Sequence, residues 1–265
     1  MAANESTETG DGRSAAARAQ PMFNAPTIVV ALLGCLVAVH LLRQLLTPLQ
    51  DDWWVLALAF IPARFSDYGA LLPGGRLASV TSLLTHQFVH GDAPHLLINS
   101  AWLLAIGSIV ARRVGAGRFI GLFLVSGIFG ALAFSAINPG QATPMIGASG
   151  AISGLMGAVV RFMFTALNHR RGPELRENPA AIPRAPLAEV FRDRRALVMI
   201  GSLVALNLLL GLGLGKLITD GGIAWEAHIG GFLAGLFLFA WFDHPQGATG
   251  TQDVDLDETI DDTKV

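Results

Sequence analysis

Long runs of apolar residues, separated by short polar segments, follow one another along most of the chain. A helix that spans a membrane needs about 20 mostly apolar residues. By this criterion we predict six spanning helices, which are Thr27–Leu46, His95–Val110, Phe119–Ile137, Met145–Leu167, Leu197–Leu217 and Trp225–Phe242. A further run, Trp53–Ile61, is too short to span and ends at Pro62, so we predict an interfacial or re-entrant piece there. The pattern therefore predicts an all-α membrane protein with a six-transmembrane-helix bundle.

The composition agrees with this pattern and excludes several other classes of protein. Hydrophobic residues make up 52% of the chain, charged residues 14%, and the mean hydropathy is +0.52. An ordinary soluble domain carries about 25% charged residues, so a cytosolic enzyme, a disordered chain and a secreted disulfide scaffold are excluded. The net charge of −2 includes no basic surplus, and we expect no nucleic-acid partner. The single cysteine, Cys35, cannot form an internal disulfide, and we assign it to packing.

The two ends of the chain differ from its middle. Residues 1–26 lack the apolar core of a cleavable signal peptide, and residues 244–265 are acidic. We therefore predict a cytoplasmic N-terminal tail over 1–26, a membrane domain over 27–243, and an acidic cytoplasmic tail over 244–265. Both tails are expected to be disordered because they have too few apolar residues to form a core.

The distribution of Lys and Arg predicts the orientation in the membrane. Fourteen of the 18 positive residues fall in the two tails, in the connection after the second predicted span, and in the stretch from Arg161 to Arg195 at and after the end of the fourth. The positive-inside rule places these segments on the cytoplasmic side. With six spans both termini are then cytoplasmic, and we expect a multi-pass protein of a prokaryotic cell (inner) membrane.

Few polar side chains fall within the predicted spans, where polar groups are costly and are functional candidates by default. His95 and Asn99 begin the second span four residues apart, so they share one face of a helix. Ser149 begins the fourth span, and His228 lies near the start of the sixth. Taken singly, each residue could serve packing or satisfy a buried contact. Together they lie at about the same depth near the outer ends of their helices, which indicates a site.

Glycines on the fourth and sixth spans would allow these two helices to approach closely. Small residues that repeat on one helical face permit such contact in lipid, and the spacing of His228 to two of the glycines that follow it places all three on one stripe. The predicted helix-packing glycines are Gly147, Gly150, Gly154, Gly157, Gly231 and Gly235. Their contact would bring the hydroxyl of Ser149 to the imidazole of His228.

A serine hydroxyl becomes a strong nucleophile when an adjacent imidazole takes its proton. We therefore predict Ser149 as the nucleophile and His228 as the general base and acid. The backbone N–H of Ser149, at a helix start, could stabilise an oxyanion together with His95 and Asn99. No Asp or Glu is placed to orient the base, since Glu226 is two residues before His228 and points away from it. The prediction is a Ser–His dyad.

Together and in this order, these motifs resemble those of the rhomboid family of intramembrane serine proteases. The resemblance covers 27–242 and rests on His95-Leu-Leu-Ile-Asn99, Gly147-Ala-Ser149-Gly150 and Ala227-His228-Ile-Gly-Gly231. It implies the same roles for Ser149 and His228, and for His95, Asn99 and the Ser149 N–H at the oxyanion. It also implies transmembrane protein substrates, cleaved within the lipid bilayer near their outer ends without a metal or cofactor. It implies nothing about the oligomeric state.

The sequence departs from the family pattern at several positions. Thr81 and Ser82 stand where members often have a Trp-Arg pair before the histidine-rich stretch. Ala111 stands where a glutamate often follows Gly107. Ser153 stands where some members have an aromatic residue that packs against the base. These changes concern loop anchoring and the positioning of the histidine.

Some of these residues allow other interpretations. His86, His90 and His95 could hold a metal, but Gln87 stands where a zinc protease of the HExxH type has its glutamate. Structural hydrogen bonds are therefore favoured for His86 and His90. A catalytically silent relative that binds transmembrane clients is a second possible function, although it need not have kept both Ser149 and His228. A small-solute transporter would show an internal repeat, which we do not find in the two halves of the sequence.

Overall fold

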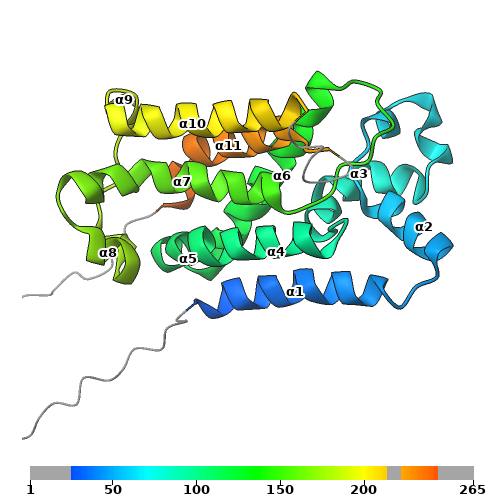
Figure 1. Cartoon of the computed structure of the whole chain (residues 1–265), viewed down its shortest axis with the longest axis horizontal. Coiled ribbons are helices and arrows are strands. Elements are labelled where there is room, and N and C mark those ends of the chain that lie inside the picture. Colours follow the sequence, from blue (N-terminus) through cyan, green and yellow to red (C-terminus); the bar gives the residue numbers. More distant parts are fainter. Residues whose placement is uncertain (1–24, 214–221, 244–265) are drawn as a thin grey trace, which may run out of the picture.

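The computed structural model describes residues 25–213 and 222–243, and most of these residues are helical (Figure 1). The predicted tails 1–26 and 244–265 fall almost entirely outside the described residues. The longer helices are α1 (Thr27–Arg43), α2 (Pro48–Leu58), α3 (Gly75–Thr85), α4 (Ala93–Trp102), α5 (Ser108–Val114), α6 (Ala116–Ile137), α7 (Ser149–Asn168), α10 (Arg194–Gly211) and α11 (Trp225–Phe242). The shorter helical pieces are η1 (Pro62–Phe65), η2 (Asp67–Leu71), η3 (His86–Phe88), η4 (Leu103–Gly107), α8 (Gly172–Glu177), η5 (Pro179–Ala181) and α9 (Leu187–Val190).

Five helical segments of 18 to 22 residues are long and apolar enough to cross a membrane. Four of them are single helices, α6, α7, α10 and α11, and the fifth is the continuous segment Ala93–Val114, in which the π-helical turn η4 joins α4 to α5. The remaining predicted span is the apolar helix α1, which has 17 residues. The all-helical membrane architecture is therefore confirmed, with five candidate spans and one shorter apolar helix in the described part of the chain.

The first predicted span ends earlier in the structure than the apolar pattern indicates. It ends at Arg43, not Leu46, and the Arg43 guanidinium donates to both carboxylate oxygens of Asp51 at 2.7 and 2.9 Å. The side chain of Thr47 then caps the start of α2, so the chain turns instead of extending α1. The short run predicted at the interface falls largely in α2, a helix of 11 residues with Trp53 and Trp54 exposed.

The fourth predicted span begins at Ser149 instead of Met145. The backbone of Met145 pairs with that of Phe60 through hydrogen bonds of 2.8 and 3.0 Å, which holds this part of the chain extended. The helix therefore starts four residues later than predicted, and Ser149 becomes its first residue.

The fifth predicted span, Leu197–Leu217, corresponds to α10, which begins three residues earlier and ends at Gly211. The last part of that prediction, 214–217, lies outside the described residues. The second and third predicted spans are each extended by a few residues, to Ala93–Val114 and Ala116–Ile137. The added turns include Arg112, Arg113 and Arg118, so the helices continue through charged residues that hydropathy alone does not assign to a span.

The centre of the bundle is made by α6, α7 and α11, and the most enclosed of the five candidate spans is α7 (Figure 1). The backbones of α7 and α11 touch at five of the six predicted glycines, the exception being Gly147, which precedes α7 and lies against His95. A Cβ atom added to Gly231 would lie 2.0 Å from the carbonyl oxygen of Gly150, and one added to Gly235 would lie 1.7 Å from that of Gly154. One added to Gly157 would lie 2.2 Å from the carbonyl oxygen of Phe232. No side chain fits at these positions, so the glycines set the distance between the two helices.

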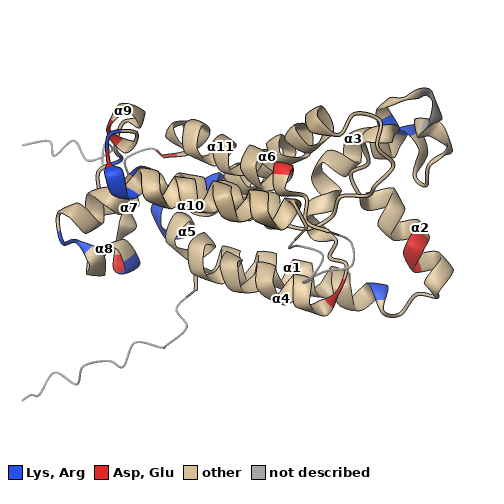
Figure 2. Ribbon diagram, turned by 45° about the horizontal axis from the view of Figure 1, so that its top comes forward, with Lys and Arg blue, Asp and Glu red and all other residues tan. Residues whose placement is uncertain are grey.

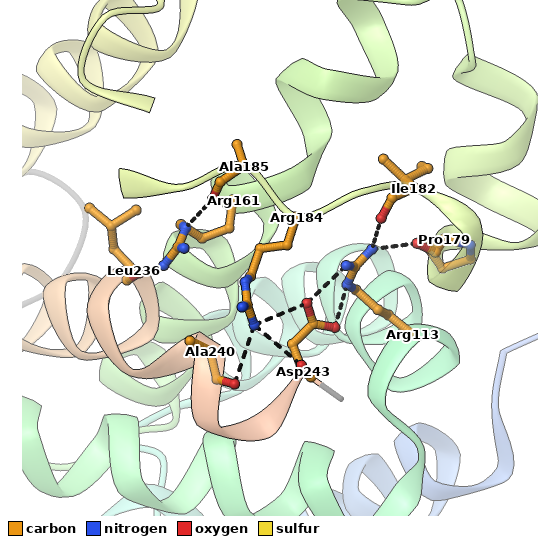
Figure 3. A network of polar contacts seen from close by, with 9 residues as sticks. All are labelled: Arg113, Arg161, Pro179, Ile182, Arg184, Ala185, Leu236, Ala240 and Asp243. Atoms are coloured by element: carbon orange, nitrogen blue, oxygen red, sulfur yellow. Dashed lines mark hydrogen bonds and ion pairs between the residues drawn. The ribbon is translucent and has the colours of Figure 1, made fainter. Parts of the chain in front are cut away.

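Arginine residues gather mainly at the end of the bundle that holds α8 and α9 (Figure 2). The chain enters α1 and leaves α11 at this same end (Figure 1). Figure 3 shows the hydrogen bonds that three of these arginines, Arg113, Arg161 and Arg184, form within the protein. Arg113 donates to both carboxylate oxygens of Asp243 at 2.8 and 2.9 Å, and Arg184 donates to backbone oxygens of Ala240 and Asp243. These contacts tie the end of α11 to α5 and to the connection after α7.

Arg161 is the third of these arginines, and its side chain is buried within α7. Its guanidinium donates to the carbonyl oxygens of Ala185 and Leu236 at 3.0 and 2.9 Å (Figure 3). A buried cation is tolerated only when its N–H groups are paired, and these carbonyls supply acceptors. The arginines of this region therefore have a structural role in addition to the predicted role in orientation.

Candidate active site

The side chains of Ser149 and His228 meet where α7 and α11 cross. The Ser149 Oγ lies 2.7 Å from the Nε2 atom of His228, although the residues are 79 positions apart. Ser149 is the first residue of α7 and His228 lies in the first turn of α11. The glycine contacts continue from this point toward the other ends of the helices, so the close helix packing also sets the distance between hydroxyl and imidazole. Both residues are partly exposed.

The loop before Ser149 has a backbone conformation that favours glycine. Gly147 has φ +116°, in the region that side chains rarely adopt. A Cβ atom at this position would also lie 2.7 Å from the Nε2 atom of His95. Gly147 is therefore required for two reasons, the turn into α7 and the close approach of the His95 ring.

The histidine-rich stretch before α4 holds this loop in place. The Gly147 N–H donates to the carbonyl oxygen of His86 at 2.9 Å, and the Ala148 N–H donates to the Nε2 atom of His90 at 3.4 Å. The Nδ1 atom of His86 lies 2.7 Å from the carbonyl oxygen of Ser82. These are structural hydrogen bonds, the role that the sequence favoured for His86 and His90.

His86 and His90 are buried, and burial disfavours the charged imidazolium. It lowers the pKa of His86 to about 4, against the opposing effect of the backbone contact with Ser82. It lowers the pKa of His90 to about 3, with the nearby His95 as the next cause. Both rings are therefore neutral near pH 7, and His90 can accept the hydrogen bond from Ala148.

The alternative of a metal site at these histidines receives no support from their contacts. One ring nitrogen of each is already engaged, that of His86 by Ser82 and that of His90 by Ala148. Among residues 25–213 and 222–243, no group of three or more His, Cys, Asp or Glu side chains is arranged to hold a metal ion.

The two residues predicted for the oxyanion lie on α4. The His95 ring lies against Gly147, two residues before Ser149, and packs edge-on to His90 with 5.0 Å between ring centroids. The buried Asn99 donates from Nδ2 to the carbonyl oxygen of His95 at 3.0 Å. The structure thus brings His95 to the loop beside Ser149, whereas this hydrogen bond of Asn99 stays within its own helix.

The start of α7 supplies backbone donors. The first N–H groups of a helix have no carbonyl one turn earlier to bond with, and Ser149 and Gly150 occupy these positions. Glu226 does not face the base: its carboxylate accepts a hydrogen bond of 3.0 Å from the Asn138 side chain. This agrees with the expectation that Glu226 points away from His228.

One residue of the site was missed by the sequence interpretation. The Oδ1 atom of Asn207, on α10, lies 2.6 Å from the Nδ1 atom of His228. The sequence offered no Asp or Glu as a third polar group beside His228, and Asn207 is neutral. Its position inside the predicted fifth span could have indicated it, because polar residues within a span are candidates for a functional role by default.

Gly147→Ala is expected to slow the reaction of Ser149 with a covalent serine-directed probe. The added methyl group would displace the His95 ring or the loop, and a shift of about 1 Å near reacting groups can cost about 10²-fold in rate. Gly140→Ala is the matched control, because Gly140 also has a positive φ of 71° in the same loop but no atom lies within 4 Å of its Cβ position. The rate of covalent labelling of Ser149 measures both. Equal losses in the two variants would contradict the role assigned to the His95 contact.

A comparison with protein families gives a match over much of the chain. A family model described as a Rhomboid domain matches residues 77–245. This region contains all the residues of the candidate site, from His86 to His228.

Individual relatives show the same similarity. The chain is 31% identical over 169 residues to "Rhomboid protease GluP" of Bacillus subtilis, which covers 63% of this chain and 27% of that protein. It is 28% identical over 172 residues to "Rhomboid protease GlpG" of Yersinia enterocolitica, covering 64% of this chain and 50% of that protein. It is 34% identical over 135 residues to "Rhomboid protein 1, mitochondrial" of Saccharomyces cerevisiae. This match covers 49% of this chain and 35% of that protein. The matches thus span half or less of these relatives, which come from bacteria and from a eukaryote.

Proposed function

The chain belongs to the rhomboid family, and we propose that it is an intramembrane serine endopeptidase that cleaves transmembrane segments near their outer ends. The observation that carries the proposal is the distance of 2.7 Å between the Ser149 Oγ and the His228 Nε2 at a helix crossing made by glycines. A hydroxyl and an imidazole in this arrangement are a nucleophile and its base.

The reaction proceeds in two stages. His228 takes the hydroxyl proton of Ser149 as the oxygen attacks the carbonyl carbon of the scissile peptide bond, and it then gives this proton to the leaving amine. In the second stage His228 takes a proton from water, whose oxygen attacks the acyl carbon, and then returns the proton to Ser149 as the acyl group leaves. The partial exposure of both side chains supports this step, since water must reach them.

Negative charge develops on the carbonyl oxygen in both stages. We assign its stabilisation to the N–H of Ser149 with His95 and Asn99, because donors aimed at this oxygen lower the barrier. The contact of His95 with Gly147 supports its share of this role. The Asn99 amide has two N–H hydrogens, and one of them is used in the bond to the His95 carbonyl. The second is the donor that we assign to the oxyanion.

We also propose six membrane spans with both termini on the cytoplasmic side. The arginine-rich end of the bundle is the end where α1 begins and α11 ends, which supports this orientation (Figures 1 and 2). The site then opens toward the opposite, outer side. Transmembrane proteins are the proposed substrates, and they enter from the surrounding lipid.

Labelling with a fluorophosphonate probe tests the proposal without knowledge of a natural substrate. The wild-type protein in detergent is expected to react, and Ser149→Ala is not. His228→Ala should be slower by about 10²–10⁴-fold, the usual contribution of a general base. A chelator should leave labelling unchanged. A wild-type protein that stays unlabelled at high probe concentration would indicate a catalytically silent relative.

A further inference from the structure

The helix α10 contributes one polar side chain to the site, and this side chain contacts the base. His228 is held on both sides: its Nε2 atom lies 2.7 Å from the Ser149 Oγ, and its Nδ1 atom lies 2.6 Å from the Asn207 Oδ1. The three side chains come from α7, α11 and α10. A hydrogen-bonded line thus runs from the hydroxyl through the imidazole to an amide on a third helix.

The orientation of the Asn207 amide follows from its second contact. Its Nδ2 atom lies 2.8 Å from the carbonyl oxygen of Leu203, one turn earlier on α10. A carbonyl can only accept a hydrogen bond, so the NH2 group must face it and the amide oxygen must face His228. Since that oxygen is also only an acceptor, the Nδ1 atom of His228 must carry the proton.

This assignment determines the state of the other ring nitrogen. A neutral imidazole has one N–H and one free lone pair. With the proton on Nδ1, the lone pair is on Nε2, which faces the hydroxyl of Ser149. This is the tautomer that a general base needs. The residue one turn after Ser149 is Ser153, which is too small to hold the ring by stacking.

The contact also links the base to the least enclosed of the candidate spans. Only Ala196 is buried among the residues of α10. In the view of Figure 1, α10 lies along one edge of the bundle and α1 along the other. The orientation of His228 therefore depends on a helix that is mostly exposed to the surroundings, and movement of α10 away from α11 would remove the acceptor at Nδ1.

We propose that Asn207 is a positioning residue, which holds the His228 ring in its base-competent tautomer and completes a hydrogen-bonded Ser149–His228–Asn207 arrangement only when α10 is packed in place. The kinetic consequence rests on the proposed function. The tautomer itself does not, since it follows from the three side-chain contacts.

The test uses the full-length protein with Asn207→Leu, which keeps a side chain of similar size but has no acceptor. The turnover of a transmembrane substrate should fall by about 10- to 100-fold, the range expected when a reacting group loses its alignment. The KM should change little, because Asn207 does not touch the substrate. The control is Leu209→Ala, an exposed position on the same helix, which should retain wild-type turnover.

Asn207→Asp separates positioning from a structural role. It restores an acceptor, so turnover should recover relative to Asn207→Leu. The acidic limb of the pH profile should also move to higher pH, because a carboxylate stabilises the imidazolium and a higher pH is then needed to free the base. A loss of thermal stability in Asn207→Leu with wild-type turnover per active site would overturn the proposal.

Nuclear magnetic resonance of protein with ¹⁵N-labelled histidine reads the tautomer directly, in the inactive Ser149→Ala background. We expect a protonated Nδ1 and an unprotonated Nε2 on His228, and loss of this preference on adding Asn207→Leu. An unchanged Nδ1–H signal in that variant would overturn the proposal. This measurement needs no proteolysis, so it decides on Asn207 even if the protein cleaves nothing.

Discussion

Replacing Ser149 by alanine is expected to abolish cleavage of a transmembrane substrate while the protein still folds. In the proposed reaction this change removes the atom that attacks the peptide bond, and losses on the order of 10⁶-fold follow when a serine protease loses its nucleophile. It removes a single oxygen from a partly exposed position at a helix start, so its effect on stability should be small. Cleavage of a reporter substrate in liposomes measures the effect.

The matched control is Ser153→Ala, which makes the same chemical change one turn later on α7. This variant should cleave at close to the wild-type rate. Comparable thermal stability of both variants would show that the loss in Ser149→Ala is chemical. Near wild-type cleavage by Ser149→Ala would exclude Ser149 as the nucleophile.

The second large effect is expected from Gly235→Ala in the middle of α11. The new Cβ would lie 1.7 Å from the carbonyl oxygen of Gly154 and 2.5 Å from its carbon, and both atoms belong to the backbone. No rotamer change relieves such a contact, so the helices must separate. We expect a destabilisation of about 3 kcal/mol, the upper part of the usual range for overpacking. This corresponds to a decrease in Tm of about 6–12 °C for a domain of this size.

Cleavage should decrease in the same variant, because Gly235 and His228 share α11 and a displacement of about 1 Å costs about 10²-fold in rate. Gly201→Ala is the control, since it lies within α10 with no atom within 4 Å of its Cβ position. Alanine favours a helix over glycine by about 1 kcal/mol, so this control should be neutral or slightly stabilising. If Gly235→Ala has the stability of wild type, the glycines do not set the helix distance.

The sequence was sufficient for the main architecture of this protein. A run of about 20 apolar residues can satisfy its backbone only as a helix in lipid, so the spans follow from the pattern without knowledge of their neighbours. The glycine stripes were equally direct, because i, i+3 and i+4 spacing determines which residues share a face. The proximity of Ser149 and His228 followed from the same stripes, since two glycine faces can approach only along them.

The ends of the helices depended on contacts that the apolar pattern does not contain. The first helix ends at Arg43, whose charge is paired with Asp51 on the next helix. The fourth span starts late because Met145 is paired with Phe60, 85 positions earlier in the numbering. Hydropathy indicates only whether a residue is apolar enough to lie in lipid. The predicted first and fourth spans therefore included residues that tertiary contacts hold in a non-helical conformation.

By itself, the sequence determined that this chain forms apolar helices, which faces of α7 and α11 can touch, and therefore which serine and histidine can meet. Only the tertiary structure decided which side chain contacts the Nδ1 atom of that histidine. Asn207 is 21 positions before His228 on a separate helix, and it reaches the ring only because α10 packs beside α11 with this face inward. The direction in which a helix faces is set by its neighbours, since rotation about its axis changes none of its internal hydrogen bonds. The apolar and glycine pattern, which indicated the rest of the site, therefore could not predict that Asn207 is the acceptor at Nδ1.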